Sequence, residues 1–185
     1  MRKIPTLFHR DPEDRRYVTS EVTPGCEWVL AGEGTATRKY DGTCVLLDED
    51  GNWWARREVK PGKQPPAGYR AVQTDPVTGK TVGWEPIAQS AFARFHAEAV
   101  AAGADRAPGS YELVGPKLNG NPERRTGHQL LRHATAEVLA PPARDHAALR
   151  AFVLALAAES GAEGVVFHHP DGRMAKLKAR DFPPA

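Results

Sequence analysis

The chain has 185 residues, of which 41% are hydrophobic and 26% are charged, and its formal net charge is +2. This composition is typical of a globular protein, and the charge is too balanced to indicate a nucleic-acid-binding protein by itself. The sequence contains no run of about 18 apolar residues, and no apolar segment follows the basic N-terminus, so we expect neither a membrane span nor a signal peptide. We therefore predict a cytoplasmic protein with one domain over residues 1–185 and with reduced cysteines.

The first third of the chain predicts antiparallel strands. Residues 1–27 mix charges with three prolines, and we expect an irregular segment there with one short strand. Four runs of strand-forming residues follow, at 28–31, 35–40, 43–48 and 52–59. Because Asp-Gly between apolar runs is the strongest short signal for a hairpin, Asp41-Gly42 and Asp50-Gly51 both predict hairpin turns.

The middle of the chain predicts one helix among loops and strands. Residues 60–83 are rich in Gly and Pro, which indicates a loop with one short strand near residues 69–72. Apolar residues recur with a period of about 3.6 over residues 86–103, which predicts a helix that Gly103 ends. Residues 110–115 predict a strand, and residues 116–135 predict a loop with a helical turn.

The last third predicts a second helix and a hairpin, after a short strand near residues 135–139. Asp145 is a suitable N-cap for a helix that continues to Glu159, and Gly161 ends it. Residues 164–168 and 173–180 then form a hairpin around Pro170-Asp171-Gly172. This order of elements predicts an α+β fold, with antiparallel β-sheets flanked by helices.

Lys39, two residues before the first Asp-Gly turn, is a candidate nucleophile. Its ordinary interpretation is a solvated surface lysine, since a free lysine has a pKa near ~10.4 and is protonated at neutral pH. Neighbouring cations or a bound metal lower the pKa of a lysine and thereby expose its lone pair. The nucleophilic interpretation therefore requires other cations close to Lys39.

The C-terminal strand contains such cations. Lys176 and Lys178 are two residues apart on the predicted strand, so both point to one face of the sheet while Leu177 points to the other. Two adjacent lysines repel each other unless an anion lies between them, and a phosphate meets that requirement. The alternative is a charged edge strand that prevents aggregation.

Two glutamates and one arginine complete the candidate site. Glu163 directly precedes an apolar strand and is suited to hold a divalent metal against a phosphate, although an ordinary loop carboxylate remains the alternative. Glu112 lies in an otherwise apolar strand and requires a partner, such as a ribose hydroxyl or an arginine, unless that strand is half-solvated. Arg56 and Arg57 point to opposite faces of one strand, so at most one of them joins the site.

These segments, in this order, resemble the covalent nucleotidyltransferase superfamily of ATP-dependent ligases and capping enzymes. The resemblance spans most of the chain and rests on Lys39-Tyr40-Asp41-Gly42, a later arginine, the strand around Glu112, the segment 163–167 and Lys176-Leu177-Lys178. The stretch GPKLNGNPERRTGHQLLRHA, residues 115–134, is similar to the small 5′-3′ RNA ligases more than to DNA ligases.

The resemblance implies a fold and a reaction. The fold is a single ATP-grasp-like nucleotidyltransferase domain, and we expect no OB-fold because the sequence continues for only seven residues after Lys178. Lys39 would attack the α-phosphate of ATP and retain AMP as a lysyl-AMP phosphoramidate. AMP would then pass to an RNA 5′-phosphate, and an RNA 3′-hydroxyl would seal the strand. This is the chemistry of an RNA repair ligase that needs no obligate protein partner.

The resemblance also assigns roles to single residues. It makes Lys39 catalytic, Glu163 the ligand of Mg²⁺ or Mn²⁺, and the following residues nucleotide contacts: Asp41, Gly42, Arg57 (in preference to Arg56), Glu112, Lys176 and Lys178. Arg38 stands where RNA ligases often have a glutamate that recognises the adenine amino group. Because arginine has no acceptor for that group, both ATP and GTP remain possible.

Other functions remain open at this point. One alternative is transfer of a nucleotide to another 5′-phosphorylated acceptor, such as a DNA nick, and another is an RNA-binding module that has lost catalysis. An RNA substrate requires cations outside the nucleotide site, because phosphate contacts supply most of its affinity. The candidates are Arg124, Arg125 and Arg132, or alternatively Lys60 and Lys63.

Overall fold

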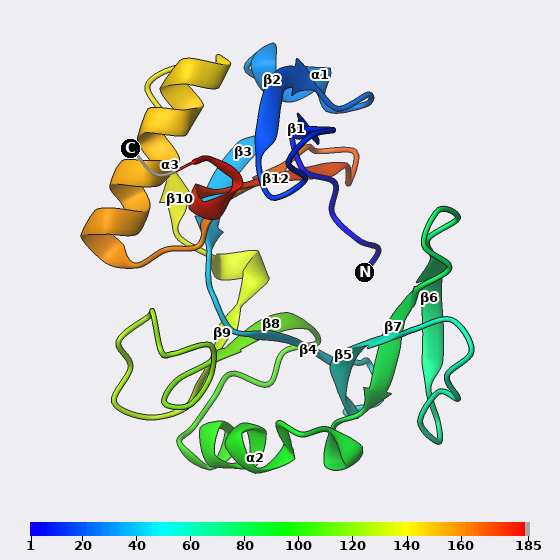
Figure 1. Ribbon diagram of the computed structural model, residues 1–185. Helices are drawn as coiled ribbons and strands as arrows, with labels where there is room; N and C mark the ends of the chain where they lie inside the picture. The colour runs from blue at the N-terminus through cyan, green and yellow to red at the C-terminus, as the bar shows by residue number, and fades with distance from the viewer. Residues whose placement is uncertain (184–185) are drawn as a thin grey trace. The chain divides into compact units, whose positions relative to one another are not determined.

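The computed structural model describes residues 1–183 and shows an α+β protein with three antiparallel β-sheets (Figure 1). The chain divides into two compact units, each with its own core. Unit 1 comprises residues 1–3 and 41–135, and unit 2 comprises residues 4–40 with the described residues from 136 onward. None of the helices in residues 1–183 has the length and apolar character required to cross a membrane. The prediction of one domain over the whole chain stays a prediction.

Unit 2 contains a four-stranded sheet, a two-stranded sheet and the longest helix. The four-stranded sheet has the order β10-β3-β11-β12. One face of this sheet is buried against α3, and Val165, Phe167 and Leu177 share a core cluster there with Leu149 and Val153 of that helix. The elements are β1 (Phe8–Arg10), β2 (Val18–Val22), α1 (Glu27–Leu30), β3 (Thr35–Lys39), β10 (Val138–Leu139), α3 (His146–Ser160), β11 (Gly164–His168), β12 (Met174–Lys178) and η3 (Ala179–Asp181).

Unit 1 contains a six-stranded sheet with the order β6-β7-β5-β4-β8-β9. The helix α2 covers one face, where its Ala99 shares a core cluster with Val45, Leu47, Tyr111 and Leu113 (Figure 1). The elements are β4 (Thr43–Leu47), β5 (Trp53–Val59), β6 (Arg70–Thr74), β7 (Thr81–Pro86), η1 (Ile87–Gln89), α2 (Ala93–Ala101), β8 (Gly109–Val114), β9 (Gln129–Arg132) and η2 (His133–Thr135).

Several predicted elements are confirmed. The carboxylate of Asp145 accepts a hydrogen bond from the amide of Ala148 and caps α3, and Gly161 ends that helix with a left-handed φ of 70°. The hairpins β4-β5 and β11-β12 form as expected. In β12 the burial alternates, so that Ala175 and Leu177 are buried while the two lysines share the opposite face.

The prediction of a hairpin at Asp41-Gly42 is wrong. Strand β3 pairs with β10 and β11, whereas β4 pairs with β5 and β8 in the other sheet. Asp41-Gly42 therefore lies where the chain leaves one sheet and enters the other. Gly42 is required there for a steric reason, since an added Cβ would lie 2.2 Å from the carbonyl oxygen of Leu113.

Other local predictions also differ from the structure. Residues 28–31 were expected as a strand, but α1 forms there, because four apolar residues are too few for periodicity to separate a helix from a strand. The expected helix over 86–103 begins only at Ala93, after the short turn η1. The N-terminal segment forms a hairpin of two strands, and β7 and β9 lie in regions that were expected as loops.

Candidate functional site

The two lysines Lys39 and Lys178 lie on either side of Gly164 in the four-stranded sheet. Gly164, the first residue of β11, pairs with Lys39 of β3 on one side and with Lys178 of β12 on the other. Adjacent strands are about 4.8 Å apart, so the two lysine backbones are separated by only about 10 Å. All three residues belong to the sheet face opposite to α3, because residues in register share a face.

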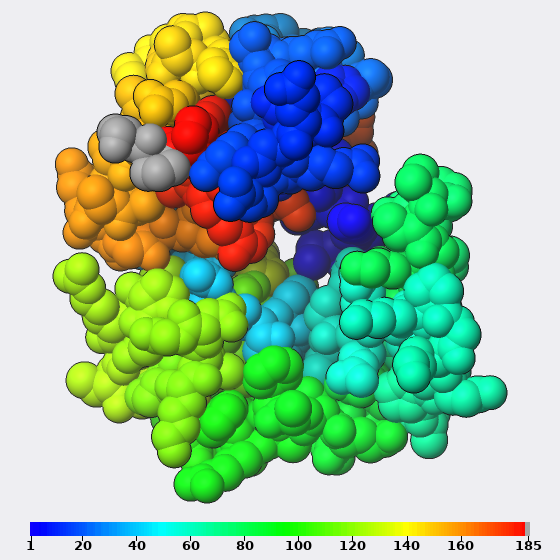
Figure 2. All heavy atoms as spheres, viewed as in Figure 1, coloured from blue at the N-terminus to red at the C-terminus, as the bar shows by residue number. Residues whose placement is uncertain are grey.

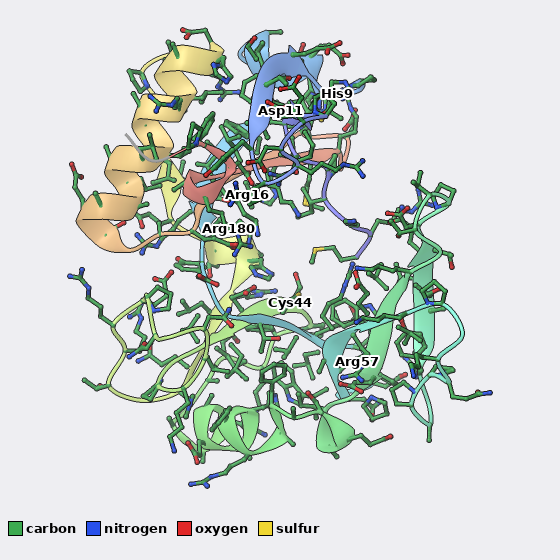
Figure 3. All side chains as sticks on the ribbon, viewed as in Figure 1. His9, Asp11, Arg16, Cys44, Arg57 and Arg180 are labelled. Carbon is green, nitrogen blue, oxygen red and sulfur yellow. The ribbon has the colours of Figure 1, made fainter. Side chains whose placement is uncertain are left out.

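Glu163 joins these lysines through its carboxylate. Its Oε2 forms an ion pair with Nζ of Lys39, and its Oε1 forms a second ion pair with Nζ of Lys178. Nη2 of Arg180, just beyond β12 (Figure 3), lies 2.9 Å from Oε1. The side chain of Glu163 is 8% exposed, whereas that of Arg180 is 69% exposed. One buried carboxylate thus faces three cations, and the cluster keeps an excess of positive charge.

The titration of this cluster reflects burial and charge together. Burial by itself raises the pKa of Glu163, but attraction to Lys39 and the hydrogen bonds from Lys178 and Lys39 outweigh it, so the pKa lies below its ordinary value. Burial lowers the pKa of Lys178, and the hydrogen bond to Glu163 opposes that effect. Lys178 is therefore easier to deprotonate than a solvated lysine.

Lys176 lies one step further along the same face as Lys178. Its strand partner is Val166, and its backbone is held on the other side by residues 5–7. The amide of Leu7 donates to the carbonyl of Lys176, and the amide of Lys176 donates to the carbonyl of Pro5. The backbone of β12 at Lys176 is thus already paired. Lysines are therefore not needed at this point to keep an open strand edge from aggregating, which was the alternative interpretation.

Arg38 lies on the opposite face from Lys39. Its guanidinium donates to Oγ of Ser160 at 2.8 Å and to the carbonyl of Ser160 at 2.9 Å, at the C-terminus of α3. A cation at that end of a helix satisfies a free carbonyl and interacts favourably with the helix dipole. Arg38, whose position in the sequence left ATP and GTP both possible, therefore has a structural role in unit 2.

In unit 1, Glu112 of β8 is buried and hydrogen-bonded. Its Oε1 accepts a hydrogen bond of 3.1 Å from the amide of Gly42, and its Oε2 lies 3.1 Å from Nε2 of His133. Nδ1 of His133 lies 2.9 Å from Oγ of Ser110. The partner that a carboxylate in an apolar strand requires is thus His133, which the sequence did not predict. The sequence offered one signal: Ser110 and Glu112 are two residues apart in one strand, so their side chains share a face and can bind the same partner.

The register of the six-stranded sheet separates the two candidate arginines. Cys44 of β4, labelled in Figure 3, pairs with Glu112, and Leu46 pairs with Trp54. Because paired residues and alternate residues share a face, Arg56 lies on the face of Glu112. Arg57 follows on the other face, where it pairs with Gly83 of β7. The geometry favours Arg56 as the arginine on the face of Glu112.

The predicted site residues thus fall into two groups, each described within its own unit. Lys39, Glu163, Lys176 and Lys178 converge in unit 2, on the sheet face opposite to α3. Asp41, Gly42, Arg57 and Glu112 belong to unit 1. Of this second group, Asp41 and Gly42 share a partner, since Nδ2 of Asn119 donates to Oδ1 of Asp41 and to the carbonyl of Gly42.

The predicted metal ligand fits a particular kind of metal site. Among the described residues, no group of three or more His, Cys, Asp or Glu side chains is placed to hold a metal ion by itself. Glu163 offers one carboxylate, and Mg²⁺ is commonly held by one or two carboxylates together with the phosphates of a substrate. Glu163 could therefore hold a metal only together with the phosphates of a bound nucleotide. The metal would then replace the ammonium group of Lys39 or Lys178 beside the carboxylate.

The protein belongs to the α+β class, and its sheets are antiparallel. No family model matches the chain, and no curated protein matches it in sequence. The geometry of the site is therefore the basis on which a function is proposed.

Proposed function

We propose that the protein is an ATP-dependent RNA ligase of the nucleotidyltransferase type, with Lys39 as the nucleophile. One observation supports this most strongly: Lys39, Lys178 and Arg180 converge on the buried carboxylate of Glu163. A cluster with excess positive charge is suited to an anionic substrate, and a lysine within it is suited to attack a phosphate.

The first step forms a bond between nitrogen and phosphorus. Lys39 first loses its proton to solvent water, because only the neutral amine has a free lone pair. Its Nζ then attacks the α-phosphorus of ATP, the bond between that phosphorus and the bridging oxygen breaks, and pyrophosphate leaves. Lys176 and Lys178, on the same face, stabilise the negative charge that develops on the α-phosphate oxygens.

Glu163 has two roles in this proposal. In the structure it is the counter-ion of Lys39, and with ATP bound it would become the protein ligand of a divalent metal. Mg²⁺ or Mn²⁺, when bound, would neutralise phosphate charge and make pyrophosphate a better leaving group. The movement of the carboxylate from lysine to metal would release the ammonium group to deprotonate.

The later steps transfer AMP to RNA and seal the strand. An oxygen of the RNA 5′-phosphate attacks the phosphorus of lysyl-AMP, and the bond to Nζ of Lys39 breaks. The 3′-hydroxyl of a second RNA end then attacks the 5′-phosphorus, and AMP leaves. Glu112, Asp41, Gly42 and an arginine of β5 are the proposed nucleotide contacts in unit 1, with Arg56 favoured over the Arg57 expected from sequence.

The test of the first step is labelling with [α-³²P]ATP. We expect a label on the wild-type protein that is stable in alkali and labile in acid, as a phosphoramidate is, and no label on Lys39→Ala. The matched control is Lys60→Ala, an exposed lysine of unit 1, which keeps the label. A wild-type protein that takes no label from ATP in the presence of Mg²⁺ or Mn²⁺ rules out the proposal.

The same assay separates the alternatives. Label from GTP but not from ATP would make the enzyme GTP-dependent, although the position of Arg38 at α3 removes the reason to expect this. A 5′-phosphorylated single-stranded RNA and a nicked DNA duplex, tested side by side, distinguish an RNA ligase from an enzyme that seals nicks. An RNA-binding module without catalysis would bind RNA and take no label.

A further inference from the structure

The loop of residues 116–128, between β8 and β9, has an unusual backbone. Four residues other than glycine have a left-handed conformation, with φ values of 67° at Lys117, 47° at Asn119, 56° at Asn121 and 50° at Arg124. Asparagine adopts this region readily, but lysine and arginine rarely do. Strained residues of this kind persist only where the surrounding structure holds them, and they concentrate at functional sites.

The loop is held from several sides within unit 1. Leu118 is buried in the core beneath α2, and His128 stacks on Phe95 with its Nε2 2.6 Å from the carbonyl of Pro116. The side chain of Asn121 makes two hydrogen bonds with the backbone of Arg125. These contacts fix the shape of the loop before any ligand arrives.

Further contacts tie the loop to the turn that follows Lys39. Asn119 donates to the carboxylate of Asp41 and to the carbonyl of Gly42, and the amide of Asp41 donates to Glu123. Consecutive Cα atoms are about 3.8 Å apart, so the Cα of Asp41 lies within about 7.6 Å of the Cα of Lys39 along the chain. The loop is therefore anchored to Asp41 and Gly42, the turn that follows Lys39 in the chain.

The charge of the loop is positive and exposed. Lys117 and Arg124 are exposed, and among residues 1–183 neither has an acidic side chain as an ion-pair partner. Glu123 is the one acidic residue of the loop, and its carboxylate accepts from the amide of Asp41. Figure 2 shows this part of the chain, in yellow-green, on the surface of unit 1. Two exposed cations thus extend from a backbone that the contacts of the loop hold in place.

We propose that the loop 116–128 of unit 1 binds the phosphate backbone of single-stranded RNA, with Lys117 and Arg124 as the phosphate contacts. The identity of the polyanion rests on the proposed ligase function. A fixed loop loses little entropy when it binds, which explains why strain is retained at two cationic positions where glycine or asparagine would be easier to accommodate. Contacts to phosphates position a strand without reading its sequence.

The test is the binding of a short, fluorescent, 5′-phosphorylated single-stranded RNA, followed by anisotropy from low to physiological salt. The variant Lys117→Asn/Arg124→Asn removes both charges and keeps side chains that tolerate positive φ. We expect it to bind RNA about tenfold more weakly, and the slope of log K against log salt to be about 1.4 less steep, since each lost phosphate contact on a single strand contributes about 0.7.

Two further variants serve as controls. Lys60→Asn/Lys63→Asn makes the same change of net charge in another exposed loop of unit 1, and we expect wild-type RNA binding. Lys117→Arg/Arg124→Lys exchanges the two cations and keeps both charges, so its affinity should remain within about twofold of wild type. An asparagine variant with wild-type affinity and slope, or a Lys60/Lys63 variant that loses as much, overturns the proposal.

The failure of this inference can be told apart from the failure of the proposed function. The ligase proposal fails when the wild-type protein takes no label from ATP, in an assay without RNA. The loop proposal fails in the anisotropy assay, which contains no ATP. A wild-type protein that takes the label and binds RNA, while Lys117→Asn/Arg124→Asn binds RNA equally well, overturns only the loop proposal.

Discussion

At the scale of single residues, Glu163 supplies the negative charge that the cations around it share. Its carboxylate is the shared counter-ion of Lys39, Lys178 and Arg180, and its side chain is nearly buried. Removal of one partner from a buried ion pair is far more costly than removal from a solvated pair, because charges remain without compensation. Glu163 is thus a stabilising residue as well as a proposed metal ligand.

We predict that Glu163→Gln lowers the free energy of unfolding by about 2 kcal/mol at neutral pH, an amount between the values for exposed and buried pairs. The folded-state pKa of Glu163 lies below its ordinary value of 4.5, so its contribution is complete above that pH and is lost as the pH falls through the folded pKa. The difference between wild type and variant should therefore shrink in acid.

Urea unfolding of both proteins from neutral pH to pH values below 4 measures this difference. Glu137→Gln is the matched control, since its side chain is 56% exposed and it should change stability by less than about 0.5 kcal/mol. A difference between wild type and Glu163→Gln that stays constant in acid would contradict the assignment of the ion pair.

Arg38 gives a second prediction at this scale. Its two hydrogen bonds to Ser160 hold the C-terminus of α3 on the sheet. We expect Arg38→Met to lower the free energy of unfolding by about 2 kcal/mol, because charge-assisted hydrogen bonds at a helix C-terminus are lost. The ratio of labelling by ATP and by GTP should not change, because Arg38 and Lys39 lie on opposite faces of β3.

Chemical denaturation and parallel labelling with the two nucleotides check this prediction. Arg94→Met serves as the control, since the side chain of Arg94 is 81% exposed. A change of nucleotide preference without a loss of stability would show instead that Arg38 reaches the nucleotide.

At the scale of elements, the central strand β11 brings the two lysine strands together. Gly164 has no side chain, and an added Cβ would lie 2.1 Å from the carbonyl oxygen of Leu177 and 2.7 Å from the Cα of Lys178. Both atoms belong to the backbone of β12, so relief of the clash requires the strand itself to move. The close approach of β11 and β12 therefore depends on this glycine.

We predict that Gly164→Ala destabilises the protein by about 2 kcal/mol or more, as expected for overpacking against a backbone. The same change should weaken labelling of Lys39, since it moves Lys178 relative to Glu163. Thermal unfolding and the [α-³²P]ATP assay measure the two effects. Gly127→Ala is the control, because an added Cβ at Gly127 meets no atom within 4 Å. Equal stability of the two variants would contradict the prediction.

Local signals predicted many elements and misassigned others for identifiable reasons. The capping residues Asp145 and Gly161 predicted both ends of α3, because caps satisfy backbone groups of the helix itself. Strand β7, by contrast, contains Gly83 and Pro86 and follows a stretch rich in Gly and Pro, which indicated a loop. Its partners β5 and β6 supply the pairing that stabilises it as a strand. Strand formation depends on neighbours that are distant in sequence, so composition alone was a poor guide there.

At the scale of the whole molecule, the two units differ in how the chain builds them. Nearly all of unit 1 is the continuous segment 41–135, which contains all six strands of its sheet and the helix α2. Unit 2 needs residues from both ends of the chain, since β3 comes from the first part and β10, β11 and β12 come from the last. The units should therefore behave differently when they are separated.

We predict that a fragment of residues 41–135 folds by itself, whereas a fragment of residues 136–183 does not, because β11 loses its pairing with β3 and its core loses Leu7, Phe8 and Trp28. Circular dichroism during heating should show a cooperative transition only for the first fragment. A first fragment that melts without cooperativity, or a second fragment that melts with it, would show that the division into units does not describe folding.

The sequence by itself determined the α+β class, the alternation that gives Lys176 and Lys178 one face, and the set of candidate residues for phosphate chemistry. These depend on side-chain period and residue type, which are local properties. Only the tertiary structure decided that Lys39 and Lys178 lie on either side of Gly164, that Glu163 joins them, that Arg38 serves α3, and that Asp41-Gly42 connects two sheets. Each of these depends on which distant strands pair, and pairing is set by the packing of the whole chain.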